Sequence, residues 1–317
     1  IGMGNTVVCK PSELTPMTAD LLMRAVDSVG LPAGVVNLVH GDGIGAGAPL
    51  VEHPDVDLVS FTGGTSTGEK VASSAAPMFK KMSLELGGKN SSIVFEDCDM
   101  ESTVTGVVRS GFLNQGQVCL CGSRILVEDS IYDEFEEKFV EAVEALAIGD
   151  PSDESTQLGA LISKEHLQKV RAYVDLALEE GGTVLTGGEP CLPSELGGGN
   201  WMAPTVISGL SPDSRCSTEE IFGPVVTLHR FKTEDEALEI ANCTRYGLAG
   251  SVWTGDLDRG RRFSESIETG MVWINAWLHR DLRVPFGGVK DSGIGREGGK
   301  WSLGFFSEAM NVCVKHD

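Results

Sequence analysis

Short hydrophobic, β-branched runs alternate with segments of helical spacing along the first 95 residues. The runs predict strands, at residues 5–10, 35–40, 58–62, 83–86 and 92–95. The segments between them predict helices, at residues 15–29 and 69–74, the first with Thr15 as N-cap and Pro16 at its first position. Alternating strands and helices favour an α/β fold with a mainly parallel, doubly wound sheet.

The rest of the chain continues the mixed pattern. Helical spacing recurs in four segments, at residues 102–113, 130–147, 164–180 and 233–244. Strands are predicted at 251–253 and 271–274, and the glycine-rich stretch 181–201 predicts a strand, a loop and a return strand. Residues 306–314 form a last extended, apolar run, so strands and helices alternate to the end of the chain.

Composition is ordinary for a globular protein, with 41% hydrophobic and 22% charged residues among 317. That length can bury a large core and predicts about two domains. No apolar run approaches the roughly 20 residues that cross a bilayer, and no leader-like segment precedes the first strand. We therefore expect a cytoplasmic protein that does not bind membranes.

The formal net charge of −21 narrows the possible partners. Such a surface repels phosphate backbones, so nucleic-acid binding is not expected. Two interpretations of the charge stay open. One is that it keeps the protein soluble, and the other is that it reflects adaptation to a cytoplasm of high salt concentration, where ions screen the repulsion between the acidic side chains.

The eight cysteines are scattered through the chain, and their spacing fits neither a disulfide scaffold nor a zinc site. Cys119 and Cys121 lie one residue apart in "NQGQVCLCGSR", but no second ligand pair accompanies them. No metal site is predicted. Cys119 is a candidate nucleophile if a helix N-terminus or a cation lowers its pKa, and an inert buried thiol otherwise.

Glu85 in "LELGGK" is a candidate general base, because Gly87 and Gly88 after it admit close backbone approach. A surface glutamate before a tight turn is the alternative. In "FTGGTSTG", Gly63, Gly64 and Gly68 lie between a strand and a helix, where backbone N–H groups bind phosphate.

The spacing of these glycines is not G-x-G-x-x-G, so no standard dinucleotide fingerprint is present. The closer visual match, "GDGIGAG" at residues 41–47, is interpreted as a loop without that role. Lys10 and Glu13 follow the first strand and suit a ribose. Because a carboxylate accepts from both ribose hydroxyls and repels a 2′-phosphate, Glu13 favours NAD over NADP.

Six motifs occur in an order and spacing that resemble the NAD(P)-dependent aldehyde dehydrogenase superfamily: "GNTVVCKPSELTP", "FTGGTSTG", "LELGGK", "GQVCLCGSR", "EEIFGP" and "PFGGVKDSGIGRE". The resemblance covers essentially the whole chain. It implies an aldehyde-dehydrogenase-like α/β fold, with a partial Rossmann-type cofactor domain at 1–86, an α/β catalytic domain at 87–290, and a C-terminal return segment at 291–317. The last of these contains an oligomerisation strand near 306–314.

The resemblance also implies the cofactor contacts. Lys10 and Glu13 hold the adenosine ribose of NAD, and Gly63 and Gly64 line the pyrophosphate. Many relatives have a serine at the position of Gly64, so one hydroxyl contact is lost there while the backbone amides remain. Glu220 and Phe222 of "EEIFGP" position the nicotinamide ribose and ring, and Gly87 belongs to the same site.

By the same resemblance Cys119 is the nucleophile, Cys121 is its packing neighbour, and Glu85 is the general base. The implied reaction adds the Cys119 thiolate to an aldehyde, transfers a hydride to NAD, and hydrolyses the resulting thioester with water activated by Glu85.

The substrate is suggested by "NAWLHRDLRVPFGG", where Arg280 stands at a position that is aromatic or apolar in many relatives. An arginine there fits a carboxylate, and Arg283 and Asn275 are further candidate contacts. The segment resembles the 2-hydroxymuconic and 2-aminomuconic semialdehyde dehydrogenases, which implies a carboxylated semialdehyde as substrate. The alternative is that an arginine pairs with Asp281 on the surface.

Relatives carry a segment before "GNTVV" that supplies an oxyanion-hole asparagine and an oligomerisation strand. Loss of one oxyanion donor costs on the order of a hundredfold in rate, so we expect this chain alone to be a poor dehydrogenase. The intact enzyme is expected to be a homodimer or homotetramer. An inactive fragment, and an enzyme for betaine-type or simple aliphatic aldehydes, are the competing interpretations.

Overall fold

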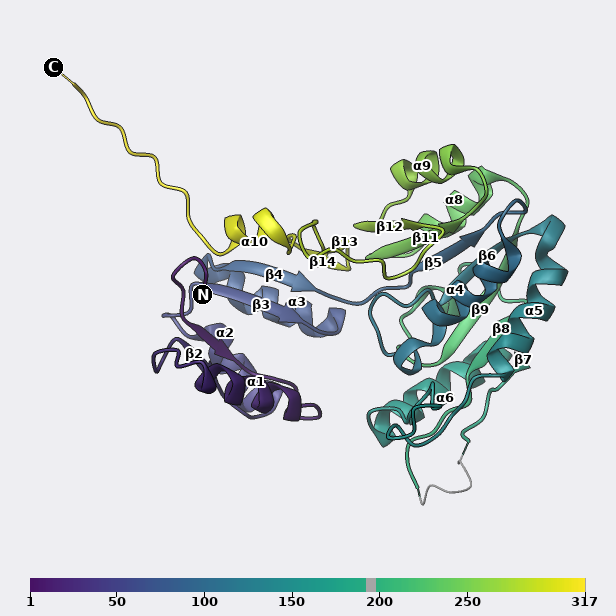
Figure 1. Cartoon of the computed structure of the whole chain (residues 1–317), viewed down its shortest axis with the longest axis horizontal. Helices are drawn as coiled ribbons and strands as arrows, with labels where there is room; N and C mark the ends of the chain where they lie inside the picture. The colour runs from purple at the N-terminus through teal and green to yellow at the C-terminus, as the bar shows by residue number, and fades with distance from the viewer. Residues whose placement is uncertain (192–197, 317) are drawn as a thin grey trace. The chain divides into compact units, whose positions relative to one another are not determined.

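A computed structural model describes residues 1–191 and 198–316 (Figure 1). The chain forms two compact units, which are described separately. Unit 1 comprises Ile1–Glu85, Asp281–Phe286 and Ile294–Asp317, and unit 2 comprises Leu86–Arg280 and Gly287–Gly293. The middle of the loop predicted within 181–201, residues 192–197, lies outside the described residues.

Unit 1 contains two parallel strand pairs, one of which belongs to a three-stranded sheet in the order β14-β4-β3. Strands β1 (Val7–Cys9) and β2 (Val36–Leu38) pair with each other, and β3 (Leu58–Thr62) pairs with β4 (Lys81–Glu85). Its helices are α1 (Met17–Ser28), α2 (Ala48–Glu52), α3 (Thr65–Ala75) and α10 (Gly299–Phe305). The ladder of β3 and β4 runs from Leu58 opposite Lys81 to Thr62 opposite Glu85. Glu85 and the following glycine-rich turn are therefore at the carboxyl end of these strands.

Several predictions for unit 1 are corrected by the structure. Helix α1 begins two residues later than predicted, with Pro16 and not Thr15 at the N-cap. The stretch "GDGIGAG" is not a loop: residues Gly43–Gly47 form a π-helical turn, because the Asp42 side chain accepts a hydrogen bond from Gly45 N–H and caps it. Helix α3 begins at Thr65, inside "GGTSTG", since Gly64 serves as its extended N-cap residue.

The predicted strand at 306–314 does not form within the described ranges of this chain. Within the part of the chain that the structure describes, residues 308–316 form neither helix nor strand. A strand needs a partner for its backbone hydrogen bonds, and no described segment pairs with this one. Met310, Val312 and Val314 are accordingly 85%, 72% and 69% exposed.

Unit 2 is built around a seven-stranded sheet in the order β12-β11-β5-β6-β9-β8-β7. The strands are β5 (Ser91–Val94), β6 (Arg124–Glu128), β7 (Thr183–Thr186), β8 (Thr205–Ser208), β9 (Val225–Phe231), β11 (Ala249–Trp253) and β12 (Met271–Ile274). Every pair is parallel except β7 with β8. The sheet confirms the mainly parallel α/β prediction.

Helices cover both faces of this sheet (Figure 1). One face packs on α8 (Glu234–Asn242) and α9 (Leu257–Ser266), and the other on α4 (Met100–Phe112) and α5 (Tyr132–Glu144). Helix α6 (Lys164–Glu179) contributes Val170 and Val174 to a second apolar cluster with β8 and β9. Shorter elements complete the unit: α7 (Arg215–Thr218), β10 (Tyr246–Gly247) and β13 (Val289–Lys290). Strand β14 (Gly293–Ile294) pairs with β4.

No helix in the described ranges is both long and apolar enough to span a membrane.

Candidate active site

Cys119 lies in a turn between the helical segment that ends at Gly116 and strand β6. The chain therefore leaves a helix before Cys119 and enters a strand after it. Asn114, Gln115 and Gly116 all have positive φ, between 51° and 69°, which bends the chain sharply just before the cysteine. The thiol-bearing residue is half-buried, so it is not sealed within the core.

Asn90 holds the cysteine turn in place. Its side-chain Nδ2 donates to the carbonyl oxygens of Cys119 at 2.8 Å and Cys121 at 2.9 Å, and its Oδ1 accepts from Ala249 N–H at 3.0 Å. Asn90 is 4% exposed, so these hydrogen bonds are shielded from water. The side chain thus ties the backbone of the cysteine turn to strand β11.

The turn after Glu85 approaches both the cysteine and Glu220. A Cβ on Gly88 would lie 2.9 Å from the Cys119 carbonyl oxygen, and a Cβ on Gly87 would lie 2.5 Å from a carboxylate oxygen of Glu220. Gly88 N–H donates to that carboxylate at 2.9 Å. A side chain at Gly88 would clash with the Cys119 backbone, and one at Gly87 would force the Glu220 carboxylate to move.

The two neighbouring cysteines differ in chemical environment. Burial raises the pKa of Cys121 to about 12, so this thiol stays protonated at neutral pH. Its Sγ instead contacts the carbonyl oxygen of Leu113 at 3.9 Å. Cys121 is therefore a packing residue.

Glu220 is a buried carboxylate whose protonation is sensitive to its surroundings. Burial raises its pKa, while the Gly88 N–H and the ammonium groups of Lys169 and Lys89 act in the opposite direction. The neighbouring Phe222 has φ 61°, and its carbonyl oxygen lies 2.6 Å from Nε2 of His166. Helix α6, which carries His166, thus holds the "EEIFGP" segment.

The predicted site residues of unit 1 lie around β1, β3 and β4. Glu85 is 6% exposed at the end of β4, and its carbonyl oxygen accepts from Gly63 N–H at 3.0 Å. Lys10 Nζ donates to the Gly41 carbonyl oxygen at 2.9 Å and lies 3.8 Å from the Glu13 carboxylate.

Gly64 precedes the first turn of α3, and a Cβ added there would meet nothing within 4 Å. A helix N-terminus presents backbone N–H groups that can bind an anion.

The three predicted substrate contacts have different environments. The Asn275 amide is used within the protein: its Oδ1 accepts from Thr254 N–H and its Nδ2 donates to the Thr254 carbonyl oxygen, both at 2.8 Å. Arg283 is 87% exposed and forms a bidentate ion pair with Asp281. Arg280 is exposed at the end of a segment of unit 2.

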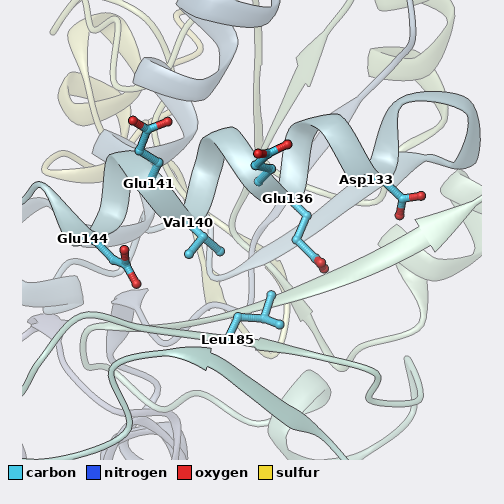
Figure 2. A pocket seen from close by; sticks show the side chains of 7 residues that line it. Asp133, Glu136, Val140, Glu141, Glu144 and Leu185 are labelled. Carbon is cyan, nitrogen blue, oxygen red and sulfur yellow. The ribbon is translucent and has the colours of Figure 1, made fainter.

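A hollow of about 360 Å³ lies elsewhere on unit 2, and none of the predicted site residues lines it. Figure 2 shows carboxylates of α5 around it, including Glu136, Glu141 and Glu144, with Leu185 of β7 opposite. Among the described residues no group of three or more His, Cys, Asp or Glu side chains could hold a metal ion. This hollow is an acidic helix surface.

Residues 1–312 match the sequence profile of the aldehyde dehydrogenase family, and the chain belongs to that family. It is 52% identical to a 2-aminomuconic semialdehyde dehydrogenase of Danio rerio, over 100% of this chain and 66% of that protein. It is 50% identical to a 2-hydroxymuconic semialdehyde dehydrogenase of Pseudomonas putida, over 99% of this chain and 65% of that protein. The chain thus spans slightly less than two thirds of the length of these relatives.

Solved structures agree with the fold. Betaine aldehyde dehydrogenase from Staphylococcus aureus, crystallised with NAD+, has a TM-score of 0.92 and 42% identity, covering 94% of this chain and 59% of that one. The aldehyde-dehydrogenase-like fold and the family resemblance are both confirmed.

Asn90 and His166 are the positioning residues that sequence reasoning missed. Each acts on a partner at least 29 residues away in the chain, Cys119 for Asn90 and Phe222 for His166. Asn90 directly follows "LELGGK", so its place beside a recognised motif was the one available signal.

Proposed function

We propose that the protein containing this chain oxidises an aldehyde to the corresponding acid with NAD, using Cys119 as nucleophile and Glu85 as general base. One observation carries the proposal: the Gly87–Gly88 turn lies against both the Cys119 carbonyl and the Glu220 carboxylate. The reactive cysteine and the predicted ligand of the nicotinamide ribose are therefore held by the same two residues of unit 2.

The residues present fit NAD. The Glu220 carboxylate can accept hydrogen bonds from ribose hydroxyls, and Gly87 beside it leaves space for the sugar. Phe222 follows two residues later, where it can contact the nicotinamide ring. Lys10 and Glu13 offer a donor and an acceptor within one short segment, and the start of α3 offers backbone N–H groups for a pyrophosphate. NAD, when bound, supplies the hydride acceptor.

The chain's own residues supply the remaining functions. The half-buried Cys119 attacks the aldehyde carbon, and its neighbour Cys121 stays protonated and takes no part. Asn90 keeps the Cys119 backbone in position as charge develops on the substrate oxygen. Glu85 accepts a proton from the water that hydrolyses the thioester, which regenerates the free thiol.

We further propose a carboxylated semialdehyde, of the 2-hydroxymuconic or 2-aminomuconic type, as the substrate. Support comes from the relatives named above at about 50% identity and from Arg280, whose guanidinium can bind a carboxylate in bidentate fashion. Arg283 is the weaker candidate because it already pairs with Asp281.

Betaine-type aldehydes are the second candidate, since Betaine aldehyde dehydrogenase of Bacillus subtilis is 43% identical over 98% of this chain. Arg280→Ala in the intact protein distinguishes the two. A carboxylate contact predicts a KM for muconic semialdehyde that rises about tenfold or more, with little change for an uncharged aldehyde. An unchanged ratio of the two KM values would exclude the carboxylate contact.

The central experiment compares Cys119→Ala with Cys121→Ala in the intact protein. The proposal expects NADH formation to be abolished in the first variant and to stay within severalfold of wild type in the second. Equal losses in both variants, with unchanged unfolding midpoints, would contradict the assignment of Cys119.

Assembly and location belong to the same proposal. The exposed apolar residues Met310, Val312 and Val314 suit a strand that pairs with another copy, so we propose a homodimer or homotetramer. All eight cysteines lie in the described residues and are free thiols, which supports a reducing, cytoplasmic location.

A further inference from the structure

A buried group of polar side chains lies beneath the C-terminal end of α8, where Arg124 donates to the Ile240 carbonyl oxygen. Ser91 of β5 and Arg124 of β6 are opposite each other in the parallel ladder, and Lys89 precedes Ser91 by two residues. Lys89, Ser91 and Arg124 are 2%, 4% and 0% exposed. The next residue, Ser92, contacts Ser110 of α4 on the other face, so Ser91 faces the layer of α8 and α9.

A small cavity adjoins this group. Its volume is about 10 Å³, which is room for one occupant of about the size of a water molecule. Lys89 and Ser91 line it on the sheet side, and Thr244, Tyr246 and Thr269 are among the residues that complete its wall. Of the described residues that line it, none is an aspartate or a glutamate.

Several donors here lack a hydrogen-bond partner among the described residues. They are Nζ of Lys89, Oγ of Ser91, and Nε and Nη1 of Arg124, all fully shielded from solvent. Only Nη2 of Arg124 is used, by the Ile240 carbonyl oxygen and by Cys243 Sγ at 3.7 Å. A buried donor without an acceptor is costly, so a group of four marks a place where an acceptor binds.

The charge of the group selects the kind of acceptor. Burial and the positive charge of Arg124 lower the pKa of Lys89 to about 7, and the weaker influences of Cys216, Glu220 and Glu219 oppose this. A water molecule must also donate two protons of its own, whereas a monoatomic anion only accepts and offsets the repulsion between the two cationic side chains.

We propose that Lys89 and Ser91, beside the Arg124 guanidinium, form a buried binding site for one halide ion, chloride in the cell. The ion accepts hydrogen bonds from Lys89 Nζ and Ser91 Oγ, and its charge stabilises the Arg124 guanidinium beside them. Occupancy stabilises the layer between the sheet and α8. The proposal does not rest on the proposed dehydrogenase activity, because no catalytic step uses an ion at this site.

The test uses the intact protein, transferred into sodium gluconate, whose anion is too large for the cavity. Replacing gluconate by bromide at constant sodium concentration keeps the ionic strength fixed, so general screening does not change. We expect the thermal unfolding midpoint to rise by a few degrees and to saturate, as ligand binding to the folded state requires. We also expect bromide anomalous scattering at the cavity in soaked crystals.

Variants decide whether the response comes from this site. Lys89→Met should abolish the bromide response, and the milder Ser91→Ala should weaken it severalfold, which keeps the test useful if the first variant folds poorly. Lys80→Met is the matched control: Lys80 is also buried, at 7% exposure, but its Nζ donates to the Val51 and His53 carbonyl oxygens. The control should keep the response.

Two results would overturn the proposal. One is a bromide response that persists unchanged in Lys89→Met, which would place the ion elsewhere. The other is density at the cavity without anomalous signal, which would identify the occupant as water.

Discussion

Because Gly87 has no side chain, the Glu220 carboxylate can lie directly against it. Alanine at this position would bring a methyl group to 2.5 Å from a carboxylate oxygen, so the carboxylate must move. We expect Gly87→Ala to raise the KM for NAD about tenfold or more with a smaller effect on kcat. Steady-state kinetics with varied NAD measures this.

Gly304→Ala is the matched control for Gly87→Ala, because a Cβ on Gly304 meets nothing within 4 Å. It should leave both kinetic constants unchanged. If Gly87→Ala behaves like this control, Glu220 is not a ligand of NAD.

Glu220 also predicts a pH dependence. Burial raises its pKa, so this carboxyl becomes protonated at a higher pH than an ordinary glutamate does. A neutral acid is a poorer acceptor for ribose hydroxyls. We therefore expect the KM for NAD to rise as the pH falls from about 8 to about 5, and Glu220→Gln to remove most of this dependence. A wild-type profile that is flat over this range would contradict the role given to Glu220.

At the scale of elements, the bend before Cys119 depends on Gly116. Its φ is 69°, and a Cβ there would lie 2.1 Å from the Gly223 carbonyl oxygen. Gly116→Ala should therefore lower the free energy of unfolding by more than about 1 kcal/mol and reduce kcat as well. Gly181→Ala separates the two causes, because Gly181 has φ 88° but open space. It should show only the smaller conformational penalty and normal kinetics.

Helix α6 matters because its first turn carries His166, which contacts the Phe222 carbonyl oxygen. Ser163 caps this helix by accepting from His166 N–H at 3.1 Å. Ser163→Ala should cost about 1 kcal/mol of stability in urea unfolding, whereas Ser163→Asp should retain most of it. Equal losses for alanine and aspartate would mean that the hydroxyl acts by packing and not as a cap.

Elements were predicted well where apolar residues repeat regularly, as in β3 at 58–62 and β12 at 271–274, whose bounds match the structure. Strands β6 and β9 escaped prediction. Each contains a side chain that a buried strand normally excludes, Arg124 in one and His229 in the other, and both are nevertheless buried. A hydrophobicity pattern cannot recognise a buried polar residue, because its compensation comes from tertiary neighbours.

At the scale of the whole molecule, the net charge of −21 predicts strong self-repulsion at low ionic strength. We expect the thermal unfolding midpoint to rise as sodium gluconate is increased from about 10 mM to about 1 M, because the Debye length falls from about 30 Å to about 3 Å. Sucrose at matched osmolality is the control for exclusion effects. A midpoint or an activity that falls with salt would argue against adaptation to a salty cytoplasm.

The sequence by itself determined the alternation of strands and helices, the family, and the candidate residues Cys119, Glu85 and Glu220, because local periodicity and ordered motifs are properties of the chain alone. Tertiary structure decided that Cys119 and Glu220 both lie against the Gly87–Gly88 turn, and that the Cys121 thiol is buried and protonated. It also decided that Asn90 links Cys119 to Ala249, and that Lys89 is buried beside Arg124. The physical reason is that hydrogen bonding and desolvation depend on residues that are distant in the chain. A local pattern of apolar and polar residues therefore cannot predict them.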